Sequence, residues 1–172
     1  MVRTILTYPD PELKKRSNPV TVITEKTREL VRDMAQTMYD APGVGLAAPQ
    51  IGVHQRVIVI DVSSKEEEPQ LIVAINPEIV HAEGDEYEEE GCLSVPKYSA
   101  NVHRHSRVVV KALNLEGEEV IFRADELLAI ALQHEIDHLD GILFIDHLSP
   151  LKRGLFRKRY LRAQEEARES QS

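Results

Sequence analysis

The sequence predicts an α+β fold, with mostly antiparallel β-sheets around a central helix that carries a His-Glu-x-x-His motif and with further helices near the N-terminus and the C-terminus. Three observations predict it. Short β-branched runs separated by turn residues occupy the middle of the chain, between residues 56 and 122. Helical spacing begins after Thr24 and again after Ser149. The segment between Asp125 and Gly141 is apolar around most of its helical circumference, which is typical of a buried helix.

The N-terminal helix is expected to span residues 25–40, with Thr24 as its N-cap. One face of this segment is apolar and is formed by Leu30, Val31, Met34, Ala35 and Met38. The helix should end at the Ala-Pro-Gly sequence of residues 41–43. Residues 43–52 are rich in glycine and alanine and have neither a helical nor a strand period, which predicts an irregular loop.

Strands are expected in the middle of the chain because β-branched residues cluster there between turn residues. The expected strands are 56–61, 71–76 and 78–82, followed by a hairpin of 102–113 and 118–122. The acidic run of residues 83–90 reads as a solvated edge.

The two later helices have clear start signals. Asp125 can cap the central helix and Gly141 can end it. Pro150 stands at the first position of the last helix, which continues through the basic stretch to residue 162, and the final residues are expected to fray. No repeat or linker divides the sequence. We therefore expect residues 1–172 to form a single catalytic domain, with 149–172 as its basic C-terminal helix and tail.

The composition, 42% hydrophobic and 29% charged residues, is that of an ordinary globular protein. A net charge of -8 disfavours general binding to nucleic acid, although residues 149–172 carry seven Lys and Arg against three Glu. The apolar runs are far shorter than the ~20 residues of a membrane span. No secretion signal pattern follows Met1. A cytoplasmic location, or the matrix of an organelle, is therefore expected.

The central helix contains the sequence His134-Glu135-Ile136-Asp137-His138. Imidazoles four residues apart lie on one helical face about 5–6 Å from each other, so both can bind one cation. Glu135 lies next to that pair, where a carboxylate can act as general base on a water molecule. Two unpaired histidines would be costly to bury in so apolar a helix, which argues against a purely structural role.

A catalytic ion of this kind needs three protein ligands and one open position. In the longer metalloprotease motif the third ligand would be a histidine at the position of Phe144, so that assignment fails. The single cysteine, Cys92, is the better candidate, because a metal holds a thiolate deprotonated. Two alternatives remain open: a zinc endopeptidase with Glu165 or Glu166 as the third ligand, and a catalytically silent metal-binding interaction protein.

Three segments resemble, in order, the signature motifs of the peptide deformylase family. They are Gly43-Val44-Gly45-Leu46-Ala47-Ala48-Pro49-Gln50, Glu90-Gly91-Cys92-Leu93-Ser94 and Gln133-His134-Glu135-Ile136-Asp137-His138-Leu139-Asp140-Gly141. The resemblance extends from about residue 8 to about residue 155. It implies a metal-dependent hydrolase that removes the formyl group from the N-terminal formyl-methionine of newly synthesised proteins, giving formate and a free methionine amine.

The resemblance also implies a set of ligands and catalytic groups. Cys92, His134 and His138 would bind one divalent ion, Fe(II) in the cell for many members and Zn(II), Ni(II) or Co(II) in others. Glu135 would be the general base. The side-chain amide of Gln50 and the backbone N–H of Leu93 would stabilise the developing negative oxygen.

For the substrate, the resemblance implies that the backbone of Gly45 meets the backbone of the nascent polypeptide. The methionine slot would be formed by Val44, Leu127, Ile130 and Ala131, which a packed core would equally explain. Glu88 stands near this slot at a position that is often apolar in relatives. Arg104 resembles an arginine that orders carboxylate neighbours, although a surface charge is the alternative.

The implied partners are formyl-methionyl nascent polypeptides, with no membrane and no DNA. The basic C-terminal helix resembles the segment through which some deformylases dock at the ribosomal exit. A solvated charged helix would show the same pattern.

Overall fold

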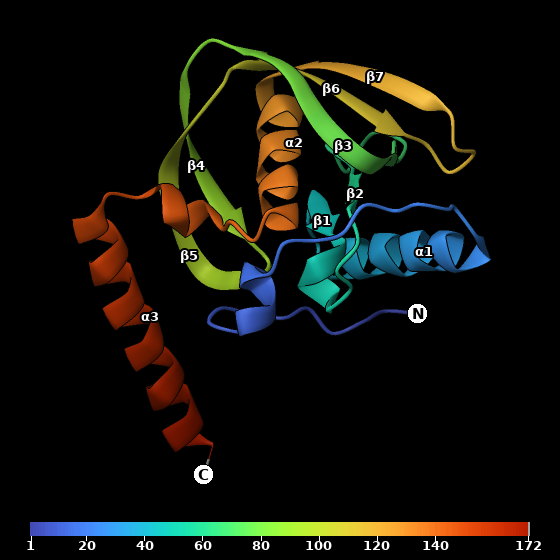
Figure 1. The fold of residues 1–172 in the computed structure, drawn as a ribbon. Helices are drawn as coiled ribbons and strands as arrows, with labels where there is room; N and C mark the ends of the chain where they lie inside the picture. Colours follow the sequence, from blue (N-terminus) through green and yellow to red (C-terminus); the bar gives the residue numbers. More distant parts are fainter. Residues whose placement is uncertain (172) are drawn as a thin grey trace.

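The computed structural model describes residues 1–171, and its strands form two antiparallel sheets (Figure 1). The larger sheet has the order β1-β2-β3-β6-β7, and β4 pairs with β5 in the smaller one. The strands are β1 (Gly45–Ala47), β2 (Val57–Ile60), β3 (Ile72–Glu83), β4 (Glu86–Cys92), β5 (Val95–Arg104), β6 (Arg107–Leu113) and β7 (Glu119–Asp125). The α+β fold class and the antiparallel pairing that the sequence predicts are confirmed.

The central helix α2 (Glu126–Leu139) lies between the larger sheet and the hairpin of β4 and β5 (Figure 1). Leu132 and Leu139 are fully buried in a cluster with Ile58 and Val110 of the larger sheet. Burying a leucine side chain stabilises a fold by about 1.5–3 kcal/mol, so these contacts hold α2 firmly in place. Gly141 ends the helix with a positive φ of 74°, as the sequence predicts.

The N-terminal helix α1 (Glu25–Asp40) has the predicted bounds and packs its apolar face on the other side of β1 and β2. Met34 and Met38 are fully buried there against residues that include Leu46 and Val59. At the start of the helix, the backbone N–H of Thr24 donates to the hydroxyl of Thr27 at 3.1 Å. This capping contact satisfies a backbone group that the first turn would leave free.

Two predictions about the first half of the chain are wrong. Residues 43–52 are not an irregular loop, because 45–47 form β1 against β2 and a short 3-10 helix covers Ala48–Ile51. A strand of three residues is too short for its period to be visible in the sequence. The predicted strands 71–76 and 78–82 are one strand, β3, whose pairing with β6 shifts between Ile75 and Glu78. A bulge, rather than a turn, explains the interruption.

Two further predictions fail around the acidic run. Residues 86–90 are not merely a solvated edge but belong to β4, which pairs with β5. The predicted strand 102–113 is two strands, because β5 ends at Arg104 and β6 begins at Arg107. The four glutamates of residues 86–90 have little β-propensity, so this segment forms a strand because it pairs with β5 and buries part of one face.

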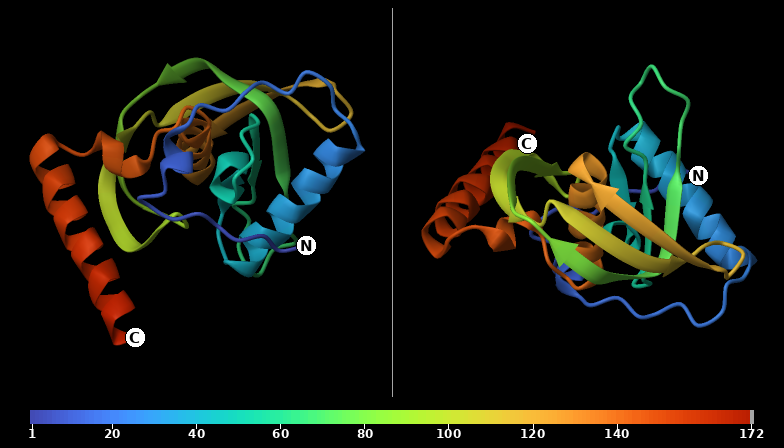
Figure 2. Two further views of the ribbon diagram at one scale, coloured as in Figure 1. Left: turned by 60° about the horizontal axis from the view of Figure 1, so that its bottom comes forward. Right: turned by 90° about the horizontal axis from the view of Figure 1, so that it is seen from above.

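The last helix, α3 (Pro150–Ser170), begins at the predicted proline and runs along the outside of β5 before it extends beyond the body (Figure 2). The ring of Phe156 in this helix packs on Tyr98 of β5 and on Tyr8. The ring centroids are 4.3 Å apart for Tyr98 and 5.5 Å apart for Tyr8. The helix continues to Ser170, further than the predicted fraying allows, and residue 172 lies outside the described part. Within residues 1–171 no helix is both long and apolar enough to cross a bilayer.

Candidate metal centre

The structure brings the three predicted ligands together. His134 and His138 lie one turn apart on α2, with their Nε2 atoms 3.2 Å from each other. Cys92, at the end of β4, places its Sγ 3.4 Å from the Nε2 of His138. The ligand atoms of all three residues lie within 4.8 Å of one another, and both histidines are buried.

This group of atoms fits a divalent cation. The sulfur accepts the backbone N–H of Ser94 at 3.4 Å and the amide of Gln50 at 3.7 Å. Burial lowers the pKa of His138 well below its usual range. Burial acts the same way on His134, but hydrogen bonds to Cys92 and Glu90 raise its pKa instead. One sulfur with two imidazoles suits Fe, Zn, Co or Ni ions.

A buried ion-pair network orients the first of these histidines. Glu90 lies 3.0 Å from the Nδ1 of His134, and Arg104 donates to both oxygens of Glu90 at 2.8 and 2.9 Å. Burial raises the pKa of Glu90, but these hydrogen bonds outweigh it and bring the pKa to about 2. An ionised Glu90 accepts a hydrogen bond from the Nδ1–H of His134 and leaves Nε2 directed at the cluster.

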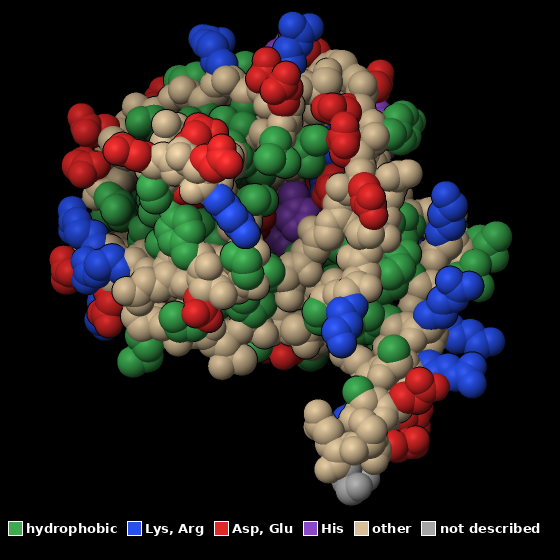
Figure 3. Space-filling model, turned by 180° about the vertical axis from the view of Figure 1, so that it is seen from behind, with side chains coloured by type: hydrophobic (Ala, Val, Ile, Leu, Met, Phe, Trp, Pro, Cys, Tyr) green, Lys and Arg blue, Asp and Glu red, His purple; other side chains and the backbone are tan. Residues whose placement is uncertain are grey.

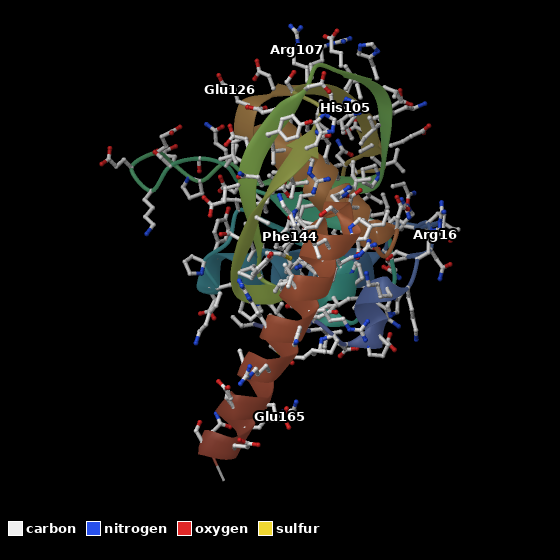
Figure 4. The ribbon with its side chains drawn as sticks, turned by 90° about the vertical axis from the view of Figure 1, so that its left-hand side faces the viewer. Arg16, His105, Arg107, Glu126, Phe144 and Glu165 are labelled. Atoms are coloured by element: carbon white, nitrogen blue, oxygen red, sulfur yellow. The ribbon has the colours of Figure 1, made fainter. Side chains whose placement is uncertain are left out.

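The same arginine extends the network to Asp137 of α2 and to His147. Arg104 is 4% exposed and donates to Asp137 at 2.6 Å, and His147 lies 2.8 Å from the same carboxylate oxygen. Its predicted role of ordering carboxylate neighbours matches these contacts, whereas a surface charge does not. In Figure 4, Phe144 lies close to this region, and its ring stacks on His134 with centroids 6.2 Å apart.

Glu135 lies beside the cluster without belonging to it. A Cβ atom added at Gly45 would come within 2.5 Å of its Oε2, so only glycine leaves room for the carboxylate. Burial raises the pKa of Glu135 to about 7. A cation bound nearby would favour the ionised form and lower that pKa. Such a carboxylate can take up and release a proton near neutral pH.

Gln50 is 1% exposed, and its amide is held from both ends. Its Oε1 accepts the backbone N–H of Ala47 at 2.9 Å, and its Nε2 donates to the hydroxyl of Ser94 at 3.0 Å. The N–H side of the amide therefore faces the cluster. Leu93 follows Cys92 in the turn between β4 and β5.

A pocket of about 860 Å³ opens above the cluster (Figure 3), and the purple histidine atoms are visible at its floor. All the predicted catalytic and substrate-binding residues line it, as do two of the three predicted ligands: Val44, Gly45, Gln50, Cys92, Leu93, Leu127, Ile130, Ala131, His134 and Glu135. His138 completes the cluster beneath this surface. Val44 and Leu127 are about half exposed, so they lie at the mouth of the pocket rather than in a packed core.

Comparison with known proteins places the chain in a family. A family model described as polypeptide deformylase matches residues 2–154. The chain belongs to the peptide deformylase family. The peptide deformylase of Acidobacterium capsulatum is 53% identical over 164 residues, which are 95% of this chain and 96% of the relative. That of Thermodesulfovibrio yellowstonii is 53% identical over 153 residues, 89% of this chain and 93% of the relative.

Solved structures agree with this family membership. The crystal structure of a peptide deformylase from Legionella pneumophila has a TM-score of 0.89 at 48% identity and covers 96% of both chains. A peptide deformylase from Ehrlichia chaffeensis in complex with actinonin has a TM-score of 0.87 at 40% identity, covering 92% of this chain and 95% of that one. The predicted family is confirmed.

The rival third ligands lie elsewhere. Glu165 and Glu166 are exposed on the distal half of α3, and Figure 4 shows Glu165 far from the body that contains the site. Among residues 1–171, the group of side chains able to hold a metal ion is Cys92 with the two histidines. A zinc endopeptidase that uses a glutamate of α3 is therefore not supported.

Sequence reasoning missed three residues around the site in this family member. Ser94 is fully buried and holds the amide of Gln50, while Asp137 and His147 extend the arginine network. Asp137 could have been suspected, because an acid on a buried apolar helix needs a partner. Nothing in the sequence pointed to His147, since it lies nine residues after His138 and comes into contact with Asp137 only in the folded chain.

The network predicts that Glu90→Gln lowers metal affinity. The variant keeps the shape of the side chain but weakens its hold on His134, and losses of such outer contacts reduce affinity by about 10–100-fold. The affinity for Zn(II) or Co(II) can be measured by competition with a chelator. Glu89→Gln, one residue away on the exposed face of β4, is the control and should bind as the unmodified chain does. Equal affinities in all three proteins would contradict this role of Glu90.

Proposed function

We propose that the pocket above Cys92, His134 and His138 is where this member of the peptide deformylase family removes the formyl group from the N-terminal methionine of newly made proteins. The products are formate and a free methionine amine. The observation that supports this site most directly is the Cys-His-His cluster, with both histidines buried, at the floor of an open pocket, with the unpartnered carboxylate oxygen of Glu135 beside it. We also propose that the chain is one catalytic domain that works in the cytoplasm, or in an organelle matrix if the source is eukaryotic.

A divalent cation held by the three ligands would supply Lewis acidity, which polarises an oxygen acceptor and makes water more acidic. Glu135 then takes a proton from the attacking water as its oxygen bonds to the formyl carbon. The same carboxyl group returns that proton to the methionine nitrogen as the carbon–nitrogen bond breaks. One carboxylate serves as base and then as acid, and the ionised form that a nearby cation favours is the form needed to accept the proton.

Two groups of the chain are suited to stabilise the negative oxygen that develops during the attack. The amide of Gln50 is fixed by Ala47 and Ser94, so little reorganisation is needed when it donates to the substrate. The backbone N–H of Leu93 is the second proposed donor. Removing one such donor in acyl-transfer enzymes costs roughly 10²–10³ in turnover.

The apolar side of the pocket suits a methionine side chain. Val44, Leu127, Ile130 and Ala131 line it and present no charge. Burying a methionine side chain contributes about 1.5–3 kcal/mol. Gly45 lies on the edge strand β1, where its backbone can pair with the backbone of the substrate.

We propose Fe(II) as the ion used in the cell, with Zn(II), Ni(II) and Co(II) as possible replacements. A ligand set of one thiolate and two imidazoles accepts each of these ions. Iron beside a thiolate makes the site sensitive to oxygen.

We further propose that the basic helix α3 contacts the ribosome, where formylated nascent chains emerge. The helix extends away from the body (Figure 2), and its Lys and Arg side chains are exposed. Exposed basic groups attract the phosphates of RNA.

Glu135→Gln should retain the bound ion and lose formate release. The amide fills the space beside Gly45 but cannot accept the proton, so kcat/KM for formyl-Met-Ala-Ser should fall by roughly 10²–10⁴. Metal content measured on the same preparation separates this loss from a loss of the ion. Near-normal release by a metal-loaded Glu135→Gln protein would contradict the assignment. A wild-type protein that binds metal but releases no formate would instead indicate the silent interaction protein.

Removing the metal should abolish activity reversibly. Formate release should disappear after chelation and return after anaerobic addition of Fe(II), whereas air should inactivate the iron-loaded protein faster than the cobalt-loaded one. Cys92→Ala should not regain the ion, because it removes one of three ligands. Ion retention by Cys92→Ala, or equal stability of both loaded forms in air, would contradict the proposal.

The ribosome contact predicts that glutamine substitution of the three basic residues 157–159 reduces co-sedimentation with ribosomes. All three are exposed, so Phe156 and Tyr160 can keep their packing and formate release should be unaffected. Glutamine at Lys26, Lys65 and Arg123, which are exposed on the body, removes the same charge and should leave co-sedimentation unchanged. Equal losses in both variants, or none in either, would contradict docking through α3.

A further inference from the structure

One wall of the pocket carries a carboxylate that the proposed reaction does not use. Glu88 lies on β4 opposite Val102 of β5, and Val102 is 1% exposed, so this pair faces the interior side of the hairpin. Glu88 itself is exposed and lines the same pocket as Leu127 and Ile130. Its carboxylate therefore stands at the mouth, next to the apolar slot proposed for methionine.

The other acids of β4 are already engaged. Glu90 is buried and paired with Arg104, and Glu89 accepts a hydrogen bond from the hydroxyl of Ser99 at 2.5 Å. For Glu88, by contrast, the described residues provide neither a hydrogen bond nor an ion pair. Its charge can therefore pair with a ligand without breaking a contact within the fold.

The remaining charges around the pocket leave its mouth negative. Among residues 1–171, Lys97 is the one lysine or arginine that lines the pocket, and it lies near the turn that joins β4 to β5. Glu88 and Glu89 line the same wall, and the exposed Asp125 and Glu126 precede Leu127 at the start of α2. Figure 3 shows red acidic side chains along the hollow. A peptide that leaves the floor of the pocket therefore passes more negative charge than positive.

We propose that Glu88 makes the enzyme prefer formyl-methionyl chains with a lysine or arginine at the first or second residue after methionine. The inference rests on the proposed deformylase site, since it assumes that methionine occupies the apolar slot. An ammonium or guanidinium group in that region can approach the free carboxylate, whereas a glutamate of the substrate would be repelled. Because the pair is exposed to water, the expected preference is about fivefold.

The test compares kcat/KM on amidated peptides that differ in one charge. Formyl-Met-Lys-Ala-Ser is paired with formyl-Met-Glu-Ala-Ser, and formyl-Met-Ala-Lys-Ser with formyl-Met-Ala-Glu-Ser. Amidation removes the terminal carboxylate, which could otherwise bind Lys97. The ratio of rates within a pair cancels any general loss of activity or folding, so each variant is its own reference.

The unmodified enzyme should favour the lysine peptide of at least one pair by about fivefold, and the ratio should shrink as salt rises from about 0.01 M to about 1 M. Glu88→Gln should bring the ratio close to one, and Glu88→Lys should invert it. Glu86→Gln removes the same charge two residues away on β4, outside the pocket lining, and should keep the wild-type ratio. Lys97→Gln should increase the preference.

Two results would overturn the inference: a ratio of one for both pairs in the unmodified enzyme, or a ratio in Glu88→Gln equal to that of the wild type. Equal changes in Glu86→Gln and Glu88→Gln would assign the preference to overall charge and also overturn it. Absence of formate release from every peptide would instead refute the proposed function. The two failures are therefore distinguishable.

Discussion

The site depends on the ion pair between Glu90 and Arg104, which crosses from one strand of the hairpin to the other inside the protein. The arginine also binds Asp137, and Glu90 also binds His134, so the pair joins both strands to the central helix. Cys92 follows on the same strand as Glu90, and the two histidine ligands belong to that helix. A buried charge pair is a poor source of stability by itself, but it fixes one relative position of the elements that carry the ligands.

The sequence was most informative where local chemistry decides the structure. The helix of residues 25–40, the glycine end of the central helix and the proline start of the last helix depend on caps and periodicity, and all three were predicted correctly. The four glutamates of residues 86–90 hide a strand from sequence prediction, because that strand exists only through its pairing with β5. The strand at Gly45 was missed for the same reason, since three residues show no period.

The three side chains of the candidate metal site could be picked out because two of them share a helix turn and the third is the only cysteine of the sequence. Two of the groups that position them, Ser94 and His147, could not, because their contacts with Gln50 and Asp137 join separate parts of the chain. The sequence motifs therefore pointed to side chains that line the pocket and gave much less information on the side chains that hold them. The space beside Glu135 could not be predicted either. Gly45 leaves room for the carboxylate only because the fold brings β1 next to α2.

The attachment of α3 divides that helix into two parts under different evolutionary constraints. Up to Gln164, whose amide donates to the backbone oxygen of Tyr8 at 3.1 Å, the helix shares an aromatic cluster with Tyr98 on the strand behind the pocket. Replacements of Phe156 or Tyr160 there would be felt at Tyr98, which lines the pocket. Beyond Gln164 the exposed turns can drift in length and sequence among related proteins without disturbing the reaction centre. Sequence variation among related proteins should therefore rise abruptly after the position of Gln164 rather than gradually along α3.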